Sequence, residues 1–362
     1  MFSRFYPRLS IFRDCSVGMR GLPNYHLSCC VNTLLQTLSA TWEVAALLEK
    51  WEAAGLRGDD RNVPLQLKRV LADMRGTQPQ HAPHRDFLHC LHRNCIRLST
   101  QHDANEVFLF ILSFIQQQID DKPLALEIQN LYKISMETQL QCLECNNIQS
   151  KGSYLLSLPL HIKEDHNSLE GCMASFFQHQ ELSGINCCFC QCCETKRPSR
   201  QVRLVLMLPQ IKAASSVISS DLHHVFQGVR LRSLPRILCM QLKRFRNTLG
   251  STRKLDCRVT FPETFDFSEV VPEALCRDFV QDNCSYTLYA VVVHSGTAMC
   301  GHYTAYVCVK ERWYHADDSH VQLASWEEVQ TTFGERYGRT AYILMYRRGS
   351  REEGHRRSDL SG

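Results

Sequence analysis

A cysteine at the start of a helical stretch is the first residue in this sequence that could act as a nucleophile. Cys29 ends a loop, residues 21–28, and apolar residues with helical spacing follow it. At a helix N-terminus the free N–H groups and the helix dipole stabilise a thiolate, the nucleophilic form of cysteine. Attack on a carbonyl creates an oxyanion, which the side-chain amide of Asn24 and the backbone N–H of Cys29 are expected to bind. Taken alone this is weak evidence, because a lone cysteine beside a helix is more often a small buried hydrophobic residue.

A histidine that could serve as the base for this thiol lies more than 250 residues further along the chain. His302 follows Gly301, which permits a close backbone approach beside an imidazole. A third polar group should fix the tautomer of such a histidine. The segment 313–319 supplies carboxylates for that role in Asp317 and Asp318, on the next strand or turn. These residues together predict nucleophilic thiol catalysis.

Two C-x-x-C pairs form a third group with chemical potential, Cys142 with Cys145 and Cys190 with Cys193. Two such pairs indicate a tetrahedral, structural Zn²⁺ site with four cysteine ligands. Free thiols are the alternative, and a redox pair would need a βαβ context that these segments lack. Other cysteines leave the ligands of the second pair open: Cys187, Cys188 and Cys192.

The first 120 residues are predicted to be mostly helical. Apolar residues recur there at positions i, i+3, i+4 and i+7, the spacing of one helix face. The predicted helices begin near Cys29 and cover 31–38, 44–51, 67–74 and 104–117.

The rest of the chain is predicted to form a sheet. Apolar and polar residues alternate from Tyr132 to Leu140, the pattern of a strand with one solvated face. Shorter strands are expected at 154–160, 202–208, 237–242, 286–294, 303–309 and 342–346. Helices followed by a sheet predict the α+β class.

Composition excludes several classes of protein. The 362 residues are 44% hydrophobic and 22% charged, as in ordinary globular proteins, and the net charge of +4 implies no nucleic-acid partner. No apolar run reaches the roughly 18 residues that span a bilayer, so membrane insertion is not expected. The 19 cysteines occur without a secretory signal, which favours a reducing compartment and a cytoplasmic or nuclear location.

The three groups of residues, in this order and at these separations, resemble the ubiquitin-specific proteases, peptidase family C19. The resemblance covers about residues 20–347. The matching motifs are the cysteine segment that ends with Asn32 and Gln36, residues 101–104, the two cysteine pairs, residues 234–245, residues 301–303 and residues 341–346.

The resemblance implies a papain-like, right-hand fold of the α+β class. A helical thumb would cover about 20–130, zinc-ribbon fingers about 131–206 and a β palm about 234–347. The remaining segments would be an N-terminal tail at 1–19, an insertion at 211–233 and a disordered tail at 348–362.

The resemblance also implies a reaction. Cys29 would attack the last carbonyl of a modifier's Gly-Gly tail and form a thioester, with His302 as base and then acid. Asp317 matches the third position of the family's triad, and Asp318 matches a neighbouring polar position that supports it. Asp103 and Gln101 would contact the tail, although Asp103 also fits a helix N-cap.

Within the family the chain is most similar to the interferon-induced branch that removes a two-lobed ubiquitin-like modifier. The doubled Cys29-Cys30 and the segments 261–268 and 325–330 carry this likeness. That branch also restrains interferon receptor signalling without catalysis, which implies an interferon receptor complex as a partner. Positions that match its modifier-binding patches are Asn105, Leu109 and His294.

The chain departs from the family pattern at three places. His26 stands where the family usually has glycine, which concerns the loop before Cys29. Asn105 and Glu106 resemble ubiquitin-directed relatives, and the segment 211–233 is additional. The alternatives are therefore a ubiquitin-directed peptidase, a non-catalytic adaptor in interferon receptor signalling and a zinc-stabilised interaction module.

Overall fold

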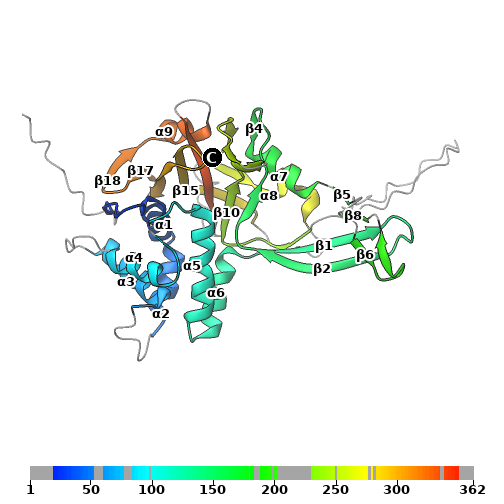
Figure 1. Cartoon of the computed structure of the whole chain (residues 1–362), viewed down its shortest axis with the longest axis horizontal. Helices are drawn as coiled ribbons and strands as arrows, with labels where there is room; N and C mark the ends of the chain where they lie inside the picture. Colours follow the sequence, from blue (N-terminus) through cyan, green and yellow to red (C-terminus); the bar gives the residue numbers. More distant parts are fainter. Residues whose placement is uncertain are drawn as a thin grey trace, which may run out of the picture.

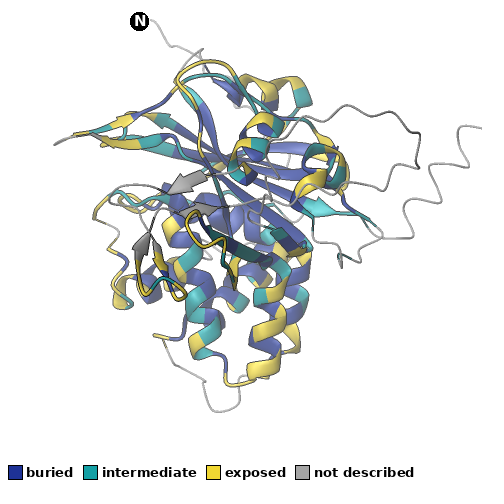
Figure 2. Cartoon of the chain, turned by 90° about the vertical axis from the view of Figure 1, so that its right-hand side faces the viewer, coloured by how far each residue is buried: buried dark blue, intermediate teal, exposed yellow. Residues whose placement is uncertain are grey.

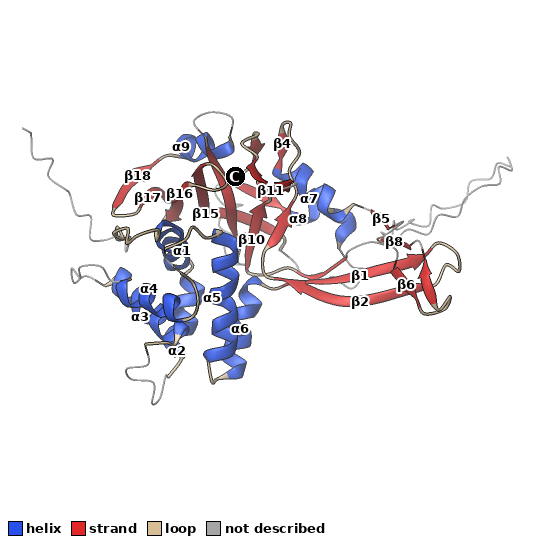
Figure 3. Cartoon of the chain, in the orientation of Figure 1, coloured by secondary structure: helices blue, strands red, loops and turns tan. Residues whose placement is uncertain are grey.

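In the computed structural model the helices from the first third of the chain gather at one end, and the rest is formed mainly by strands with a few short helices among them (Figure 1, Figure 3). The structure describes residues 19–52, 60–76, 84–97, 99–178, 180–182, 188–197, 199–201, 230–248, 251–275, 279, 283–334 and 338–349. The α+β class is confirmed, with a helical thumb, a β palm and long fingers (Figure 3).

The thumb consists of helices from the first third of the chain. They are α1 (Cys29–Ala40), α2 (Trp42–Lys50), α3 (Val63–Arg75), α4 (Arg85–Arg93), α5 (Ala104–Gln118) and α6 (Lys122–Tyr132). Side-chain oxygens of Asn62, Asp103 and Asp121 accept backbone N–H groups at the N-termini of α3, α5 and α6, as N-caps do. The four predicted helices are confirmed, and α4 and α6 are additional.

The start of the predicted strand at Tyr132 is wrong. Tyr132 is the last residue of α6 and is fully buried against Phe108, and β1 begins only at Ile134. Tertiary packing of the tyrosine ring on the thumb therefore decides its conformation against the local alternation of polar and apolar residues.

The palm is a mixed sheet whose last strand in chain order lies near its middle. The strand order is β18-β17-β16-β15-β19-β10-β3, with β14 beside β15. These strands are β3 (Leu158–Leu160), β10 (Ile237–Leu242), β14 (Thr264–Asp266), β15 (Ser285–Gly296), β16 (Gly301–Val309), β17 (Arg312–Asp317), β18 (His320–Ala324) and β19 (Arg339–Arg348). Figure 2 shows these central strands as the most buried part of the molecule.

The α1 helix packs on one face of this sheet, against β15, β16 and β17. Leu34 and Leu38 share a core with Ala305 and Val307 of β16, whereas Tyr306 between them faces a second core on the other side. This alternation is the two-residue period of a strand. The helix that begins with Cys29 is thus fixed to the strand that begins beside His302.

A second layer covers the other face of the palm. Its short elements are β4 (Asn167–Ser168), α7 (Leu169–Phe177), β13 (Val259–Thr260), α8 (Phe267–Val270), η2 (Pro272–Ala274), α9 (Trp326–Gln330) and η3 (Thr331–Phe333). The hairpin of β11 (Phe245–Thr248) and β12 (Ser251–Lys254) instead packs Phe245 against the core that the sheet shares with α1. Arg244, which has no exposed surface, donates to the carbonyls of Leu255, Cys257 and Ala341 and so joins this layer to β19.

The fingers extend away from the thumb and palm (Figure 1). Their sheet has the order β2-β1-β8-β5, with β9 also paired to β1, and a separate β6–β7 ribbon stands beside it. The strands are β1 (Ile134–Cys142), β2 (Ile148–Leu155), β5 (Gln180–Leu182), β6 (Cys188–Cys190), β7 (Thr195–Arg197), β8 (Ser199–Gln201) and β9 (Arg230–Ser233).

Other predicted boundaries need correction or stay predictions. The strand expected at 154–160 is divided between β2 and β3. Arg230–Ser233, placed in the 211–233 insertion, forms β9 and pairs with β1. The strand at 202–208, the rest of the insertion to 229, and the tails at 1–18 and 350–362 lie outside the described residues.

No helix among the described residues has both the length and the apolar character that crossing a bilayer requires.

Candidate active site and zinc site

The thiol of Cys29 lies at the first residue of α1 and is 4% exposed. Ser28 precedes the helix, and its carbonyl accepts the N–H of Asn32, 2.8 Å away. The first turn of the helix contains no acidic residue, so no carboxylate there repels a thiolate or neutralises the positive end of the helix dipole. The local setting is the one that the sequence predicts for a stabilised thiolate.

His302 lies between this thiol and a carboxylate. Its Nε2 is 2.7 Å from Oδ1 of Asp317, which leaves Nδ1 for the thiol. The hydrogen bond with Cys29 is the main cause that raises the pKa of His302 to about 9, and Asp317 raises it further. The imidazole therefore carries its proton at neutral pH, the state that pairs with a thiolate.

The tight β17–β18 hairpin places both aspartates. Asp317 pairs with His320, so Asp318 and Ser319 form a two-residue loop, and Asp318 has a left-handed φ of 48°. Asp317 ends its strand facing His302, whereas the side chain of Asp318 turns to the thumb; its nearest oxygen is 3.9 Å from His302 Nε2.

Asp318 joins the palm to the thumb. Its Oδ1 accepts from Asn32 Nδ2 at 2.8 Å, and its Oδ2 accepts from Asn24 Nδ2 at 2.8 Å. Its backbone carbonyl accepts the N–H of Leu22 at 2.7 Å. A Cβ on Gly21 would approach the Ser319 carbonyl oxygen to 2.0 Å, so only glycine fits where this loop meets the hairpin.

The side chain of Asn24 is held at both ends. Its Oδ1 accepts from Ser28 N at 3.2 Å, and its Nδ2 donates to Asp318. An amide nitrogen carries two hydrogens, so one donor is left over for another acceptor. This is compatible with the predicted oxyanion role of Asn24, which stays a prediction.

Gln101 clamps the backbone immediately before His302. Its Nε2 donates to the Gly301 carbonyl at 2.6 Å, and its Oε1 accepts the Gly301 N–H at 3.1 Å. Gly301 is also required sterically, because a Cβ there would lie 2.2 Å from Nε2 of His294. Both ends of the Gln101 amide are thus used inside the protein, while its predicted contact with a substrate stays untested.

Asp103 has the structural role that the sequence offered as an alternative. It caps α5 by accepting the N–H groups of Asn105 and Glu106, and its second oxygen accepts the hydroxyl of Tyr342 in β19. Its predicted contact with a modifier tail stays a prediction.

The structure does not fit direct modifier contacts by two of the predicted residues. Asn105 is 6% exposed and accepts from Ser157 Oγ at 2.7 Å. His294 is 2% exposed between Phe245 and Tyr303, and burial lowers its pKa to about 4. We therefore correct both to packing roles, whereas the partly buried Leu109 stays a candidate.

His26 has a left-handed φ of 60°. Left-handed backbone costs a residue with a Cβ about 1–2 kcal/mol, whereas glycine adopts it freely. Histidine therefore stands at a position where glycine would carry no such cost.

The four cysteines of the two predicted pairs converge in the fingers. All four Sγ atoms of Cys142, Cys145, Cys190 and Cys193 lie within 4.8 Å of one another. Cys142 Sγ is 3.9 Å from Cys193 Sγ, and Cys145 Sγ is 3.5 Å from Cys190 Sγ. Tetrahedral zinc with Zn–S bonds of about 2.3 Å requires sulfur separations of about 3.8 Å.

The donor set and the spacing therefore fit Zn²⁺. Cys192 is exposed and outside the cluster, which resolves one ambiguity of the second pair. Cys187 and the side chain of Cys188 lie outside the described residues.

Sequence reasoning missed how the two halves of the site are joined. Asn32 and Gln101 belong to motifs that it used, but their partners, Asp318 and Gly301, are 286 and 200 residues away. The signal for Asn32 is an amide placed one helical turn after the nucleophile, on the same helix face as the thiol.

Comparisons with known proteins agree with this geometry. The family model described as ubiquitin carboxyl-terminal hydrolase matches residues 20–346. Ubl carboxyl-terminal hydrolase 18 of Homo sapiens is 30% identical over 92% of this chain and 86% of its own length. Ubiquitin carboxyl-terminal hydrolase 47 of Xenopus laevis is 25% identical, but the match covers only 29% of that protein.

A solved structure shows the same fold. The SAGA deubiquitinating module that contains Ubp8, Sgf11, Sus1 and Sgf73, bound to monoubiquitin, matches 93% of this chain and 70% of the matched chain. The TM-score is 0.69 and the identity is 24%, so this likeness concerns the fold alone.

Proposed function

Because this chain belongs to the ubiquitin carboxyl-terminal hydrolase family, we propose that it is a thiol isopeptidase that removes an interferon-induced, two-lobed ubiquitin-like modifier from conjugated proteins. The observation that carries the catalytic part is the position of His302. Its Nε2 is hydrogen-bonded to Asp317, and Cys29 is the largest cause of its raised pKa, as expected where a nucleophile, a base and an orienting carboxylate meet.

The reaction follows from these contacts. The Cys29 thiolate attacks the carbonyl carbon that joins the modifier's last glycine to a lysine amine. The backbone N–H of Cys29 and the spare hydrogen of the Asn24 amide donate to the resulting oxyanion. His302 transfers its proton to the leaving amine, the C–N bond breaks, and a thioester remains. His302 then takes a proton from water, whose oxygen attacks the thioester and releases the modifier and the thiol.

The network around Asp318 fixes the geometry of this reaction. Asn32 and Asn24 bind its two oxygens from the thumb side, so the nucleophile and the base keep their separation while the substrate changes. Cys142, Cys145, Cys190 and Cys193 would hold a structural zinc ion that stabilises the fingers.

The choice of modifier rests on the relatives. The match to ubl carboxyl-terminal hydrolase 18 covers 86% of that protein, far more than the match to the ubiquitin hydrolase 47 sequences. The same likeness supports a role in restraining interferon signalling, with an interferon receptor complex as partner, and a place in the cytoplasm or nucleus. A ubiquitin-directed peptidase is the alternative.

The test is a side-by-side reaction with C-terminal propargyl probes built on ubiquitin and on the interferon-induced modifier. We expect the second probe to label Cys29 at least tenfold faster, and Cys29→Ala to remain unlabelled. Labelling of Cys29→Ala would refute the assigned nucleophile, and a preference for the ubiquitin probe would establish the alternative. No reaction with either probe would favour the non-catalytic adaptor.

A further inference from the structure

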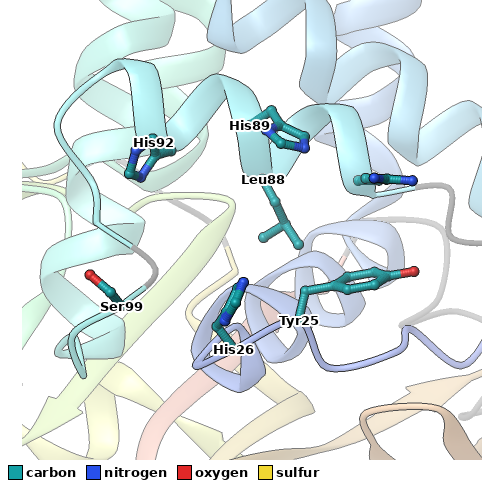
Figure 4. Close-up of a pocket in the computed structure, with 7 residues that line it drawn as sticks. Tyr25, His26, Leu88, His89, His92 and Ser99 are labelled. Atoms are coloured by element: carbon teal, nitrogen blue, oxygen red, sulfur yellow. The ribbon is translucent and has the colours of Figure 1, made fainter.

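The nucleophile and the base are attached to the fold in different ways. The loop before Cys29 leads directly into α1, and Tyr25 and His26 of this loop face α4 across a mostly apolar pocket (Figure 4). His302 instead follows Gly301, the first residue of β16, directly after an exposed turn. The base therefore stands at the end of a strand, where the hydrogen bonds between strands open most easily.

The turn before the base connects β15 to β16. Gly296 pairs with Gly301 as the last pair of residues between these two strands, and residues 297–300 form the turn. The next pair into the sheet is Ser295 with His302. A shift of the Gly296–Gly301 pair would therefore move the backbone of His302 as well.

Lys254 holds this end of the sheet from the palm. It is the last residue of β12, and its side chain is 3% exposed. Its Nζ donates to the carbonyls of His294 and Gly296 in β15, at 3.1 and 3.2 Å. It also donates to the carbonyl of Gly338, directly before β19, at 2.9 Å. One ammonium group thus joins β12, β15 and the start of β19 where His302 stands.

Gln101 holds the other member of the glycine pair from the thumb, through its two hydrogen bonds with Gly301. The ring of His294 also packs against Gly301, because a Cβ there would lie 2.2 Å from its Nε2. Lys254 binds the backbone of that histidine as well as that of Gly296. The lysine and the glutamine therefore hold the same pair of residues from opposite strands.

A buried ammonium group is costly at this place. Burial lowers the pKa of Lys254, and the exposed carboxylate of Asp256, 2.9 Å away, counteracts this effect. A neutral side chain of the same size would avoid the cost, but it could not donate to three carbonyls. The contacts of Lys254 therefore favour a residue that holds the backbone over one that only fills space.

We propose that Lys254 is a positioning residue for the base. It holds the end of β15 so that Gly296 and Gly301 stay paired and His302 keeps its contact with Asp317. This inference rests on the proposed isopeptidase reaction and adds to it a residue that touches neither the substrate nor the reacting atoms. A misplacement of reacting groups by about 1 Å costs on the order of 100-fold in rate, so the loss of Lys254 should reach kcat.

The test compares Lys254→Met with Lys122→Met. Methionine is close to lysine in size but has no donor, so it leaves the three carbonyls without the ammonium. Lys122 is the matched control, because its Nζ also donates to three carbonyls, at the opposite end of α5 from Gln101. For Lys254→Met we expect kcat on a modifier conjugate to fall on the order of 30-fold while KM stays within about twofold. Lys122→Met should keep both constants.

Lys254→Gln guards against a methionine variant that does not fold. Its amide keeps two hydrogens to donate, so we expect a kcat between those of the wild type and Lys254→Met. Each variant is measured well below its own melting temperature. A lower melting temperature with wild-type kcat in folded Lys254→Gln or Lys254→Met would show a purely structural role and overturn the proposal, as would the same loss of kcat in Lys122→Met.

Alkylation of Cys29 by iodoacetamide separates this proposal from the proposed function. The reaction needs the thiolate that pairs with protonated His302, but it needs no modifier. Tandem mass spectrometry distinguishes Cys29 from the adjacent Cys30. In Lys254→Met we expect the rate at pH 7 to fall on the order of tenfold, toward that of an ordinary thiol.

A failure of the proposed function would look different. If the wild-type protein cleaves no conjugate, the isopeptidase assignment fails, and the alkylation rates still decide the role of Lys254. Equal rates in the wild type and Lys254→Met would then overturn it, and a slower rate in Lys254→Met but not in Lys122→Met would support it.

Discussion

The catalytic cleft and the fingers keep their shapes by different means. The cleft lies between a helix and a sheet that share one core, and the amides of the buried Asn32 and the partly buried Gln101 join its two sides. The outer strand of the fingers, β2, is exposed along most of its length, and four thiols converge near its end. A site that must hold reacting atoms in place is supported by many contacts, whereas the end of the fingers would depend on four metal ligands.

Replacing Cys142 and Cys145 by serine should give the largest effect and confine it to the fingers. A structural zinc site contributes on the order of 10 kcal/mol to the folding of its domain. We expect the zinc content to fall from about one ion per chain to none, and limited proteolysis to cut within residues 140–201. The main thermal transition should stay within a few degrees, because the thumb–palm core does not contain these residues.

Two outcomes would contradict the view that the fingers and the thumb–palm core are stabilised separately. Unchanged zinc by elemental analysis would refute the site, and collapse of the whole protein would show that the two regions fold as one unit.

Asp317→Asn should act on the cleft and not on the fingers, with a large loss of activity and little loss of stability. Removing the carboxylate that orients the histidine of such a triad costs on the order of 10²–10⁴ in kcat. The side chain of Asp317 is about half exposed, so its removal should shift the melting temperature by only a degree or two. Normal zinc content is the control.

The same variant should change the pH dependence. Cys29 first and Asp317 second raise the pKa of His302 to about 9, so activity that needs the protonated imidazole should fall above about pH 9. Without Asp317 this limit should move to lower pH. A folded-state pKa above the unfolded value near 6.5 also means that the stabilisation is complete below pH 6.5 and lost as pH rises through about 9. An alkaline limit that does not move would argue against the contact.

One substitution made in both regions compares them directly. In Gly21→Ala the new methyl group would meet the Ser319 carbonyl at 2.0 Å, whereas in Gly152→Ala it would meet nothing within 4 Å. Overpacking of this kind costs about 1–3 kcal/mol, so Gly21→Ala should lower both the melting temperature and kcat. Gly152→Ala, in the exposed β2, should change neither. If the two substitutions changed the melting temperature and kcat by similar amounts, the loop at Gly21 could move enough to accept a methyl group, and the thumb–palm contact would not be tightly packed.

Gln101→Ala should have the smallest effect, on the order of tenfold in kcat. The loss of two hydrogen bonds to Gly301 would loosen His302 without removing any reacting group. A change confined to KM would instead identify Gln101 as a substrate contact, as the family resemblance implies.

Local pattern was enough to predict some elements and not others. The periodicity of Val31, Leu34 and Leu38 predicted α1 correctly, and the segment 237–242 matches β10 residue for residue. The α6 helix was missed although Asp121 offered an N-cap and Pro123 stands in its first turn, and the strand predicted after it began at Tyr132, the last residue of the helix.

The candidate site divides in the same way. Cys29 and His302 stand in motifs whose chemistry is local, so their types and neighbours were sufficient to select them. The burial of His294 and the clamp by Gln101 depend on how the thumb packs on the palm. Nothing near either residue in the chain encodes that packing, so these features became visible only in the folded structure.

The place of β19 in the palm has a consequence for how the protein is made on the ribosome. This strand, Arg339–Arg348, pairs with β15 on one side and with β10 on the other. About 100 residues separate it from β10, and at 5–20 residues per second their synthesis takes roughly 5–20 s. Until then β10 and β15 each lack their shared partner strand, so the nascent chain presents open strand edges and is exposed to aggregation.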